Sequence, residues 1–284
     1  MHDIGIIDVI GQPRIKGLPK ATARRRATTV VMVGDVPIGG SEAVVIAGPC
    51  SVEDSRQITE TALSVKRHGA SILRGGAYKP RTSPYDFQGL GVEGLKLLRR
   101  AADAARMPVV TEVMSEADVD VICDHAEMLQ VGARNMQNFA LLKRLADTGK
   151  PILLKRGPSA TIKEWLSAAE YLLHGGNENV VLCERGIKSF DNSLRNTLDL
   201  AGAAYAKELT HLPVIVDPSH ATGRRSLIPQ CARAALAIGA DGVVVEVHPR
   251  PDESVSDAQQ ALSFDAFRDL VRIAASPLRP LFEG

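Results

Sequence analysis

Residues 242–248 read Gly-Val-Val-Val-Glu-Val-His, an apolar run that ends in charged and metal-capable side chains. A short, continuous run of β-branched residues is typical of a strand in a parallel sheet that is buried on both faces. Seven similar runs precede Val243–Val245 along the chain: Val44–Ala47, Ser71–Leu73, Val109–Thr111, Met128–Val131, Ile152–Leu154, Val180–Leu182 and Val214–Val216. The pattern therefore predicts eight buried strands.

Helical patterns separate the predicted strands. One helix face is expected to carry Val92, Leu95, Leu98, Ala102 and Ala105, and another to carry Leu166, Ala169, Leu172 and Leu173. Ser115 and the spacing Thr161-x-x-Glu164 indicate helix starts. Eight strand-then-helix units with right-handed crossovers predict an α/β fold, a (β/α)8 TIM barrel over residues 41–284. A doubly wound open sheet is the alternative, because the sequence does not report closure.

Residues 1–40 differ from the rest of the chain. The basic run Arg24-Arg25-Arg26 lies among Gly and Pro, and Thr29–Val33 with Val36–Ile38 resembles a short hairpin. We expect an N-terminal arm and hairpin before the catalytic barrel. Three arginines are too few for an RNA or membrane patch, so the run is interpreted as a solvated tail.

Composition excludes several classes of protein. The net charge is +1 in 284 residues, and one Trp, four Tyr and six Phe are too few to stack nucleic-acid bases along a basic surface. Neither an apolar run long enough to span a membrane nor a secretory signal pattern is present, so we expect no membrane partner and a cytoplasmic location. Four cysteines without C-x-x-C spacing argue against a disulfide scaffold.

A charged, thiol or imidazole side chain follows each predicted strand. In chain order these are Cys50, Arg74, Glu112, Arg134, Lys155 with Arg156, Glu184 with Arg185, His220 and Glu246. The carboxyl ends of barrel strands meet at one mouth, where active sites of this fold are built. One such residue is no more than a surface charge, but all of them together predict a site.

Most of these side chains are cationic, although the whole chain is almost neutral. The expected cluster comprises Arg74, Lys79, Arg81, Arg134, Lys155, Arg156, Arg185 and Lys188. Guanidinium groups pair with two oxygens of phosphate or carboxylate, whereas lysine supplies a point charge or a proton. The sequence thus predicts a small ligand that carries phosphate and carboxylate groups.

Four further residues could form a metal site. Cys50, His220 and Glu246 follow the first, seventh and eighth strands, and Asp257 lies on the next loop. A mixed sulfur, nitrogen and oxygen set suits Mn, Fe, Co or Zn better than Mg or Ca. The spacing of these four residues does not decide between a metal site and structural roles for the same side chains. The other three cysteines are interpreted as buried apolar fillers, and His248 as a surface or supporting residue.

Several long motifs resemble the 3-deoxy-D-arabino-heptulosonate 7-phosphate (DAHP) synthases of type I, beta subgroup. They include IAGPCSVE from Ile46, LRGGAYKPRTSPYDFQGLG from Leu73, VGARNMQNFALL from Val131, LCERGIKSF from Leu182 and LPVIVDPSHATG from Leu212. The resemblance extends from about Val30 to the C-terminus. It implies a (β/α)8 barrel and a metal-dependent transferase that condenses phosphoenolpyruvate with erythrose 4-phosphate and water, the first step of the shikimate pathway.

The resemblance also implies roles for individual residues. Divalent metal ligands would be Cys50, His220, Glu246 and Asp257, and the catalytic set would be Lys79, Cys50 and His220. Substrate contacts would be Arg81 and Thr82 for the aldose phosphate, Arg74, Arg134, Lys155 and Arg185 for phosphoenolpyruvate, with Lys79 near the reacting centre and Glu112 beside the attacking water.

Two other functions are compatible with the same barrel. A related synthase uses arabinose 5-phosphate, but its loop reads Lys-Ala-Asn-Arg-Ser where this chain has Lys79 to Ser83 as Lys-Pro-Arg-Thr-Ser, which favours the four-carbon aldose. A non-catalytic phosphosugar-binding barrel would lack a metal ligand or Lys79, and all are present. By resemblance we expect a homo-oligomer, dimer or tetramer. The short flanks predict an enzyme without its own regulatory domain, which leaves regulation by a partner protein open.

Overall fold

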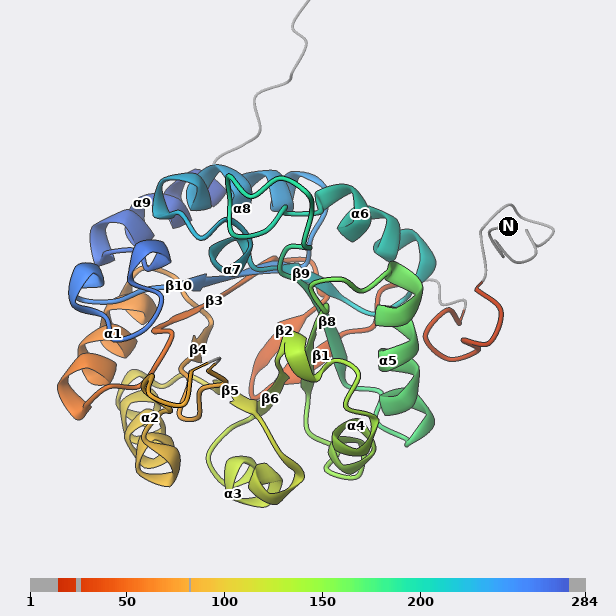
Figure 1. The fold of residues 1–284 in the computed structure, drawn as a ribbon, viewed down its shortest axis with the longest axis horizontal. Helices are drawn as coiled ribbons and strands as arrows, with labels where there is room; N and C mark the ends of the chain where they lie inside the picture. The colour runs from red at the N-terminus through yellow and green to blue at the C-terminus, as the bar shows by residue number, and fades with distance from the viewer. Residues whose placement is uncertain (1–14, 24–26, 82, 276–284) are drawn as a thin grey trace, which may run out of the picture.

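A closed barrel of eight parallel strands forms the centre of this computed structural model, which describes residues 15–23, 27–81 and 83–275 (Figure 1). Around the barrel run β3 (Val44–Gly48), β4 (Ile72–Arg74), β5 (Val109–Val113), β6 (Met128–Val131), β7 (Ile152–Lys155), β8 (Val180–Glu184), β9 (Val214–Val216) and β10 (Gly242–Glu246). The last strand pairs with the first from Gly242 opposite Val44 to Glu246 opposite Gly48. The predicted barrel is therefore confirmed, and the open-sheet alternative is wrong.

Helices form a ring outside the strands (Figure 1). They are α1 (Ser55–Arg67), α2 (Gly91–Ala105), α3 (Val119–Cys123), α4 (Phe139–Ala146), α5 (Ile162–His174), α6 (Leu200–Leu209), α7 (Pro218–Thr222), α8 (Ile228–Ala237) and α9 (Phe264–Ala275). Single 3-10 turns lie at η1 (Glu116–Asp118), η2 (Ala133–Asn135), η3 (Arg225–Leu227), η4 (Pro251–Glu253) and η5 (Ala258–Gln260). The predicted faces of α2 and α5 are buried, except that Val92 in the first turn of α2 is 42% exposed.

The two predicted helix starts differ in how they are capped. The Thr161 hydroxyl accepts a hydrogen bond from the Glu164 N–H at 3.2 Å, and the Glu164 carboxylate accepts one from the Thr161 N–H at 2.8 Å. This reciprocal pair is the predicted capping box. Ser115 precedes η1, but its hydroxyl donates to the Asp118 carboxylate at 2.7 Å and caps no helix N–H.

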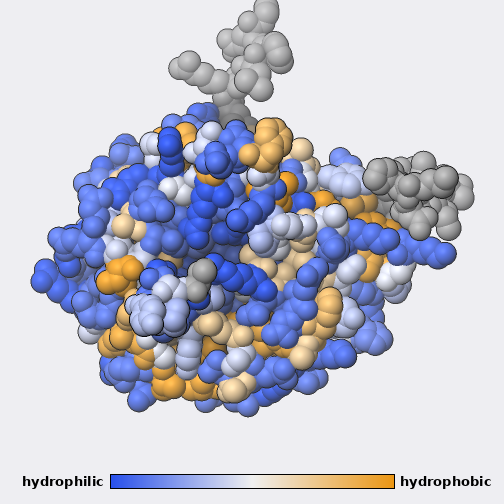
Figure 2. Space-filling view, in the orientation of Figure 1, coloured by the Kyte–Doolittle hydropathy of each residue, from blue (hydrophilic) through white to orange (hydrophobic). Residues whose placement is uncertain are grey.

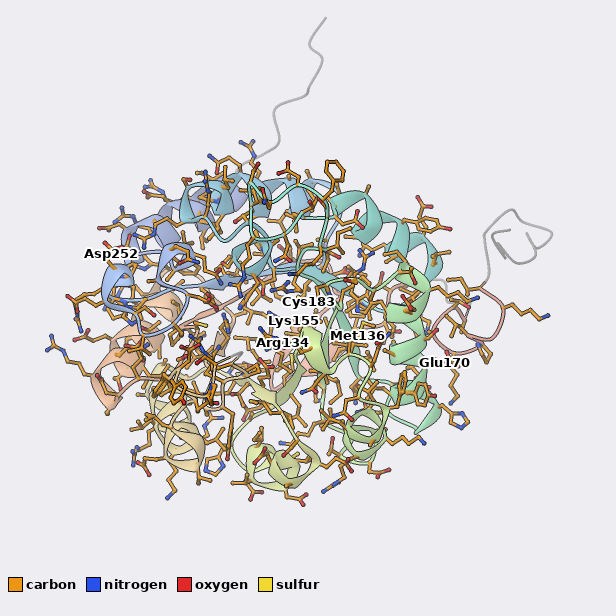
Figure 3. The ribbon with its side chains drawn as sticks, in the orientation of Figure 1. Arg134, Met136, Lys155, Glu170, Cys183 and Asp252 are labelled. Carbon is orange, nitrogen blue, oxygen red and sulfur yellow. The ribbon has the colours of Figure 1, made fainter. Side chains whose placement is uncertain are left out.

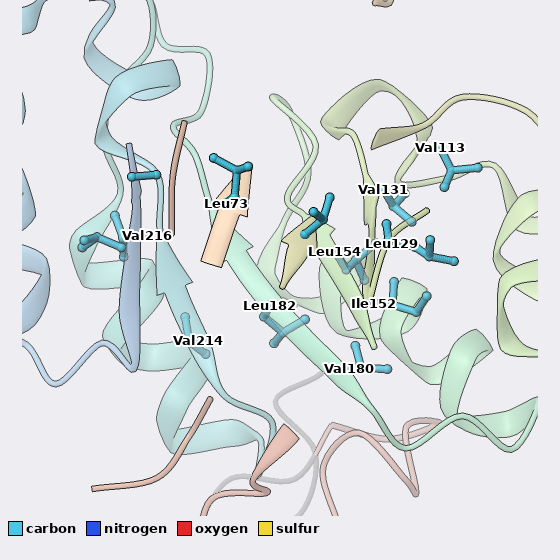
Figure 4. Close-up of a cluster of buried hydrophobic side chains, with 14 of the residues drawn as sticks. Leu73, Val113, Leu129, Val131, Ile152, Leu154, Val180, Leu182, Val214 and Val216 are labelled. Carbon is cyan, nitrogen blue, oxygen red and sulfur yellow. The ribbon is translucent and has the colours of Figure 1, made fainter. Parts of the chain in front are cut away.

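Apolar side chains fill the space on both faces of the strands. Outside the barrel, Leu129, Leu154 and Val216 belong to the layer that packs against the helices (Figure 4). Inside it, Met128, Leu153 and neighbouring strand residues form a second cluster. Successive strand residues point to opposite faces, so each short apolar run supplies both layers.

A hairpin occupies the N-terminal end of the barrel. Strands β1 (Val31–Val33) and β2 (Val36–Ile38) pair antiparallel, as predicted, and β1 lies behind the barrel in Figure 1. Val31, Val33 and Ile38 are fully buried and belong to the inner cluster. The hairpin therefore closes this end with apolar side chains. The domain boundary at residue 40 stays a prediction, and the arginine run lies outside the described residues.

Part of the predicted N-terminal arm packs on α5. The backbone N–H groups of Lys20 and Ala21 donate to the Glu170 carboxylate at 3.1 and 2.6 Å. None of the helices in the described ranges combines the length and the apolar character that crossing a membrane requires.

Candidate active site

A polar cavity of about 470 Å³ opens at the carboxyl ends of the strands. Figure 2 shows hydrophilic side chains gathered around a hollow on this face. Its lining includes the predicted residues Lys79, Arg81, Glu112, Arg134, Lys155, Arg185, Lys188, His220 and Asp257, together with Asp86, Gln130, Arg195 and Asn196. Five of the strand-end residues that the sequence singled out thus line one cavity: Glu112, Arg134, Lys155, Arg185 and His220. Glu184 was also expected at the mouth, but it does not line the cavity and instead accepts a hydrogen bond from Arg156 at 2.9 Å.

The four candidate metal ligands lie at one side of this cavity. Cys50 follows β3, His220 lies on α7, Glu246 ends β10 and Asp257 precedes η5. One possible ligand atom from each residue lies within 4.8 Å of the other three. The Cys50 thiol donates to Asp257 Oδ2 at 3.2 Å. Parallel pairing of β10 with β3 is what brings the first and last of these strands together.

The ring of His220 is oriented by Asp217, a residue that the sequence analysis did not single out. Nδ1 of His220 lies 2.7 Å from Asp217 Oδ2, and we assign the proton to Nδ1 because a carboxylate can only accept it. Burial lowers the pKa of His220 and outweighs the nearby carboxylates, so the ring is neutral. Its Nε2 lone pair then faces Glu246 Oε1 at 3.2 Å. Two acceptors facing each other favour a cation between them.

Glu246 is held from behind by two donors. Arg74 Nη1 donates to Oε1 at 2.5 Å, and Gln260 Nε2 donates to Oε2 at 2.7 Å. Burial alone would raise the pKa of Glu246, but nearby cationic charge, including that of Arg74, holds it well below its ordinary range. Arg74 was expected beside phosphoenolpyruvate; the structure places it at 4% exposure against Glu246. Its role as a substrate contact stays a prediction.

Lys79 contacts Cys50, one of the four metal candidates. Lys79 Nζ donates to Cys50 Sγ at 3.0 Å and to the Cys50 carbonyl at 3.1 Å. Burial and the charge of Glu246 raise the pKa of the Cys50 thiol to about 12. A bound divalent cation stabilises a thiolate strongly enough to overcome such a shift. The donor set of thiol, imidazole and two carboxylates therefore fits a divalent transition ion.

The same cavity is lined by three cations that have no carboxylate partner among the described residues. Among the described residues, Arg134 donates only to the Pro80 carbonyl, at 3.2 Å, and the side chains of Arg185 and Lys188 have no hydrogen bond or ion pair. Arg134 and Lys155 lie near the barrel axis in Figure 3. Burial lowers the pKa of Arg185, which shows that enclosing its charge is unfavourable. These three residues, the cation wall, predict an anionic ligand.

The remaining predicted substrate residues have defined neighbours. Arg81 pairs with Asp86 at 3.4 Å, and the Glu112 carboxylate accepts from Gln130 Nε2 at 3.0 Å. A Cβ atom at Gly132 would lie 2.0 Å from Glu112 Oε1, so only glycine lets this carboxylate lie against the backbone. Thr82 lies outside the described residues.

Arg156 was expected at the mouth, and this prediction is wrong. Its side chain is buried outside the barrel, where Nη1 donates to Glu184 at 2.9 Å and to Asp199 at 2.8 Å. The guanidinium also lies over the ring of Trp165, 5.9 Å from the centroid. Adjacent residues on an extended chain point to opposite faces, so Lys155 enters the barrel and Arg156 leaves it.

The other secondary assignments have mixed outcomes. Cys183 is buried within the barrel, as predicted, whereas Cys123 and Cys231 are only partly buried. His248 lies beside Glu53, with Nε2 at 3.3 Å from its carboxylate. Arg195 and Asn196 were missed; Arg195 donates to Asp257 at 3.1 Å and to Gln260 at 2.8 Å. Residues 195–200 read Arg-Asn-Thr-Leu-Asp-Leu, and no charge pattern there distinguishes Arg195 and Asn196 from residues of a surface loop.

Comparisons with known proteins identify relatives of this chain. The chain is 50% identical to the phospho-2-dehydro-3-deoxyheptonate aldolase of Thermotoga maritima over 86% of this chain and 72% of that protein. It is 30% identical to the 2-dehydro-3-deoxyphosphooctonate aldolase of Desulfosudis oleivorans, over 86% of this chain and 94% of that protein.

Solved structures also align with this chain. The crystal structure of the Thermotoga maritima phospho-2-dehydro-3-deoxyheptonate aldolase (DAHP synthase) aligns with a TM-score of 0.86 at 48% identity, covering 89% of this chain and 74% of that one. A truncated form of 3-deoxy-D-arabino-heptulosonate 7-phosphate synthase from the same organism aligns at 0.83 and 45%, covering 89% and 93%. The profile of the DAHP synthetase I family matches residues 20–276. The chain therefore belongs to the DAHP synthetase I family.

Proposed function

We propose that this protein is a DAHP synthase, a transferase that joins phosphoenolpyruvate to erythrose 4-phosphate with uptake of water and release of phosphate. The observation that carries the proposal is that the metal candidates and the cation wall open into one cavity. One side suits an aldehyde oxygen and the other a phosphate and a carboxylate. The 50% identity to a protein named for this activity supports it.

Phosphoenolpyruvate is assigned to the cation wall and Lys155. Arg134 and Arg185 offer guanidinium groups, which can each bind two oxygens, and Lys188 adds a point charge. Their charges are not neutralised by described carboxylates, so a ligand that carries a phosphate and a carboxylate would complement them. Erythrose 4-phosphate is assigned to the end near Arg81, with Thr82 as a further proposed contact.

Lys79 is the proposed proton donor. Burial alone would lower the pKa of Lys79, but Cys50 and Glu246 outweigh burial and raise it, so the ammonium group stays protonated. Carbon 3 of phosphoenolpyruvate attacks the aldehyde carbon, the new C–C bond forms, and the aldehyde oxygen takes a proton from Lys79. Cys50, His220, Glu246 and Asp257 would hold a divalent ion, Mn, Fe, Co or Zn. When bound, it supplies Lewis acidity toward the aldehyde oxygen.

The second half of the reaction adds water. Loss of the enol double bond leaves carbon 2 cationic, and water adds there as it loses a proton. Glu112 is the proposed residue that orients this water, because its carboxylate faces the cavity with Gln130 as its donor. The C–O bond of the resulting hemiketal phosphate then breaks, and inorganic phosphate leaves.

Two other functions compete with the proposed synthase activity. The relative from Desulfosudis oleivorans is named for an eight-carbon product, so a five-carbon aldose phosphate is the competing substrate. A barrel that binds phosphosugars without turnover is the second alternative. The Lys79 to Ser83 loop favours the four-carbon aldose over the five-carbon one. The presence of Lys79 and of all four metal candidates argues against a binding protein without turnover.

Phosphate release from phosphoenolpyruvate decides among these functions. We expect release with erythrose 4-phosphate, much less with arabinose 5-phosphate, none after treatment with EDTA, and recovery when Mn²⁺ is added. Faster turnover of arabinose 5-phosphate would reassign the substrate, and no release with either aldose would leave a binding protein. Full activity in metal-stripped protein would contradict the metal site.

We also propose a homo-oligomer, dimer or tetramer, that acts in the cytoplasm. This assignment rests on the family resemblance and on the small, charged substrates. Sedimentation at micromolar concentration would detect a monomer and so refute the oligomer.

A further inference from the structure

The carboxylate of Asp217 joins the two sides of the cavity. Its Oδ2 atom accepts hydrogen bonds from Lys155 Nζ and from His220 Nδ1, the latter at 2.7 Å, and its Oδ1 atom accepts from the His220 N–H at 2.9 Å. Asp217 is fully buried and Lys155 is 3% exposed. A single oxygen therefore contacts a candidate metal ligand and a candidate anion-binding lysine.

The fold holds Asp217 firmly in this position. It follows β9 directly and is the N-cap of α7, with Pro218 in the first turn. Its own N–H donates to the Glu184 carbonyl at 2.7 Å. Because both ends of the residue are fixed, its carboxylate cannot follow one partner and leave the other.

We propose that Asp217 is a positioning residue that couples metal binding at His220 to anion binding at Lys155, so that the two ligands bind cooperatively. The proposal rests on the proposed function and deepens it. An anion that binds Lys155 neutralises part of the ammonium charge. The hydrogen bond from Lys155 to Oδ2 then weakens, and without any movement of the carboxylate the hydrogen bond from the ring Nδ1–H of His220 to Oδ2 strengthens, which makes Nε2 a better metal donor. Linkage requires the metal to tighten anion binding by the same factor.

Direct attraction between the metal and the anion also gives positive coupling, so the test must remove only the part that passes through Asp217. D217N keeps the size of the side chain and an acceptor oxygen but removes the negative charge. D241N is the matched control, because Asp241 accepts from Lys207 and from the Val214 N–H at the other end of the barrel.

The experiment titrates Co²⁺ into metal-stripped full-length protein and follows its visible absorption, with and without saturating phosphoenolpyruvate. We expect phosphoenolpyruvate to tighten Co²⁺ binding by about 5- to 150-fold in the wild type and in D241N. In D217N, Co²⁺ binding alone should weaken by about 10- to 100-fold, and the coupling factor should fall at least about fivefold.

An unchanged coupling factor in D217N would overturn the proposal, as would unchanged Co²⁺ affinity. Neither result bears on the proposed synthase function, whereas protein that binds neither Co²⁺ nor phosphoenolpyruvate would refute the proposed function itself. If D217N does not fold, K155M and R185M each remove one cation from the cavity. K155M should tighten Co²⁺ binding more than R185M does. Equal changes would assign the effect to charge acting through space, and the proposal would fail.

Discussion

At the N-terminal end of the barrel the interior is filled by Val31, Val33 and Ile38, whereas at the C-terminal end the same channel holds Lys79, Lys155 and Glu246. Each apolar residue at the first end gains free energy from burial without needing a partner. Each of these three buried charges has an opposite charge or an acceptor beside it. Stability is therefore concentrated at one end and chemistry at the other.

The largest effect is expected from K79M at the polar end. The change removes the proposed proton donor, and kcat should fall by about 10²- to 10⁴-fold. Steady-state phosphate release measures it, and metal content shows whether the site is retained. K207M is the matched control, because Lys207 pairs with Asp241 at 2.5 Å near the apolar end. A normal kcat in K79M would assign the proton to another donor.

At the apolar end, I38A should change stability and leave activity per folded molecule intact. Ile38 is fully buried, and the truncation leaves a cavity that costs about 2 to 5 kcal/mol of unfolding free energy. Denaturant unfolding gives the loss directly. M32A is the control on the same hairpin, since Met32 is 49% exposed and should cost little. A large fall in kcat for I38A would show that the two ends are not independent.

A smaller effect is expected from R185M, which separates a functional arginine from a structural one. Arg185 contacts no described carboxylate, so stability should hold, while KM for phosphoenolpyruvate should rise by about 10- to 150-fold, as for 1.5 to 3 kcal/mol. R156M breaks the buried pair with Glu184 and should instead cost about 3 to 5 kcal/mol of stability. The comparison fails if both variants lose stability equally.

The smallest effect is expected far from both ends, at the capping box of α5. T161A should cost about 1 kcal/mol. Hydrogen bonds from the Thr161 N–H and hydroxyl lower the pKa of Glu164. The Glu164 carboxylate therefore contributes fully to the free energy of unfolding above its unfolded pKa of about 4.3. This contribution is lost as the pH falls through the lower pKa of the folded state. Thermal unfolding from pH 7 to pH 3 should show the gap between the two proteins narrowing, and a widening gap would contradict this assignment.

Sequence alone determined the number of strands, the helices between them and the chemical type of each strand end. Short β-branched runs and helical periodicity are local properties, so Val243–Val245 predicted a buried strand without its neighbours. The same reasoning identified Cys50, His220 and Glu246 as candidates, because residues at the ends of barrel strands must meet. The apolar hairpin at Val36–Ile38 was also visible in this way, although its position inside the barrel was not.

Only the tertiary structure decided which of these side chains touch. Asp217 lies 62 residues from Lys155, and Arg74 lies 172 residues from Glu246, yet each pair is in contact. Such pairs depend on barrel closure, strand register and the face to which each residue points, none of which leaves a local pattern. Lys155 and Arg156 are adjacent in the sequence, yet their side chains point to opposite faces of the barrel wall, so that Lys155 lies in the cavity and Arg156 outside it. The sequence thus determines which charged residues follow each strand, and closure of the barrel determines which residues they contact.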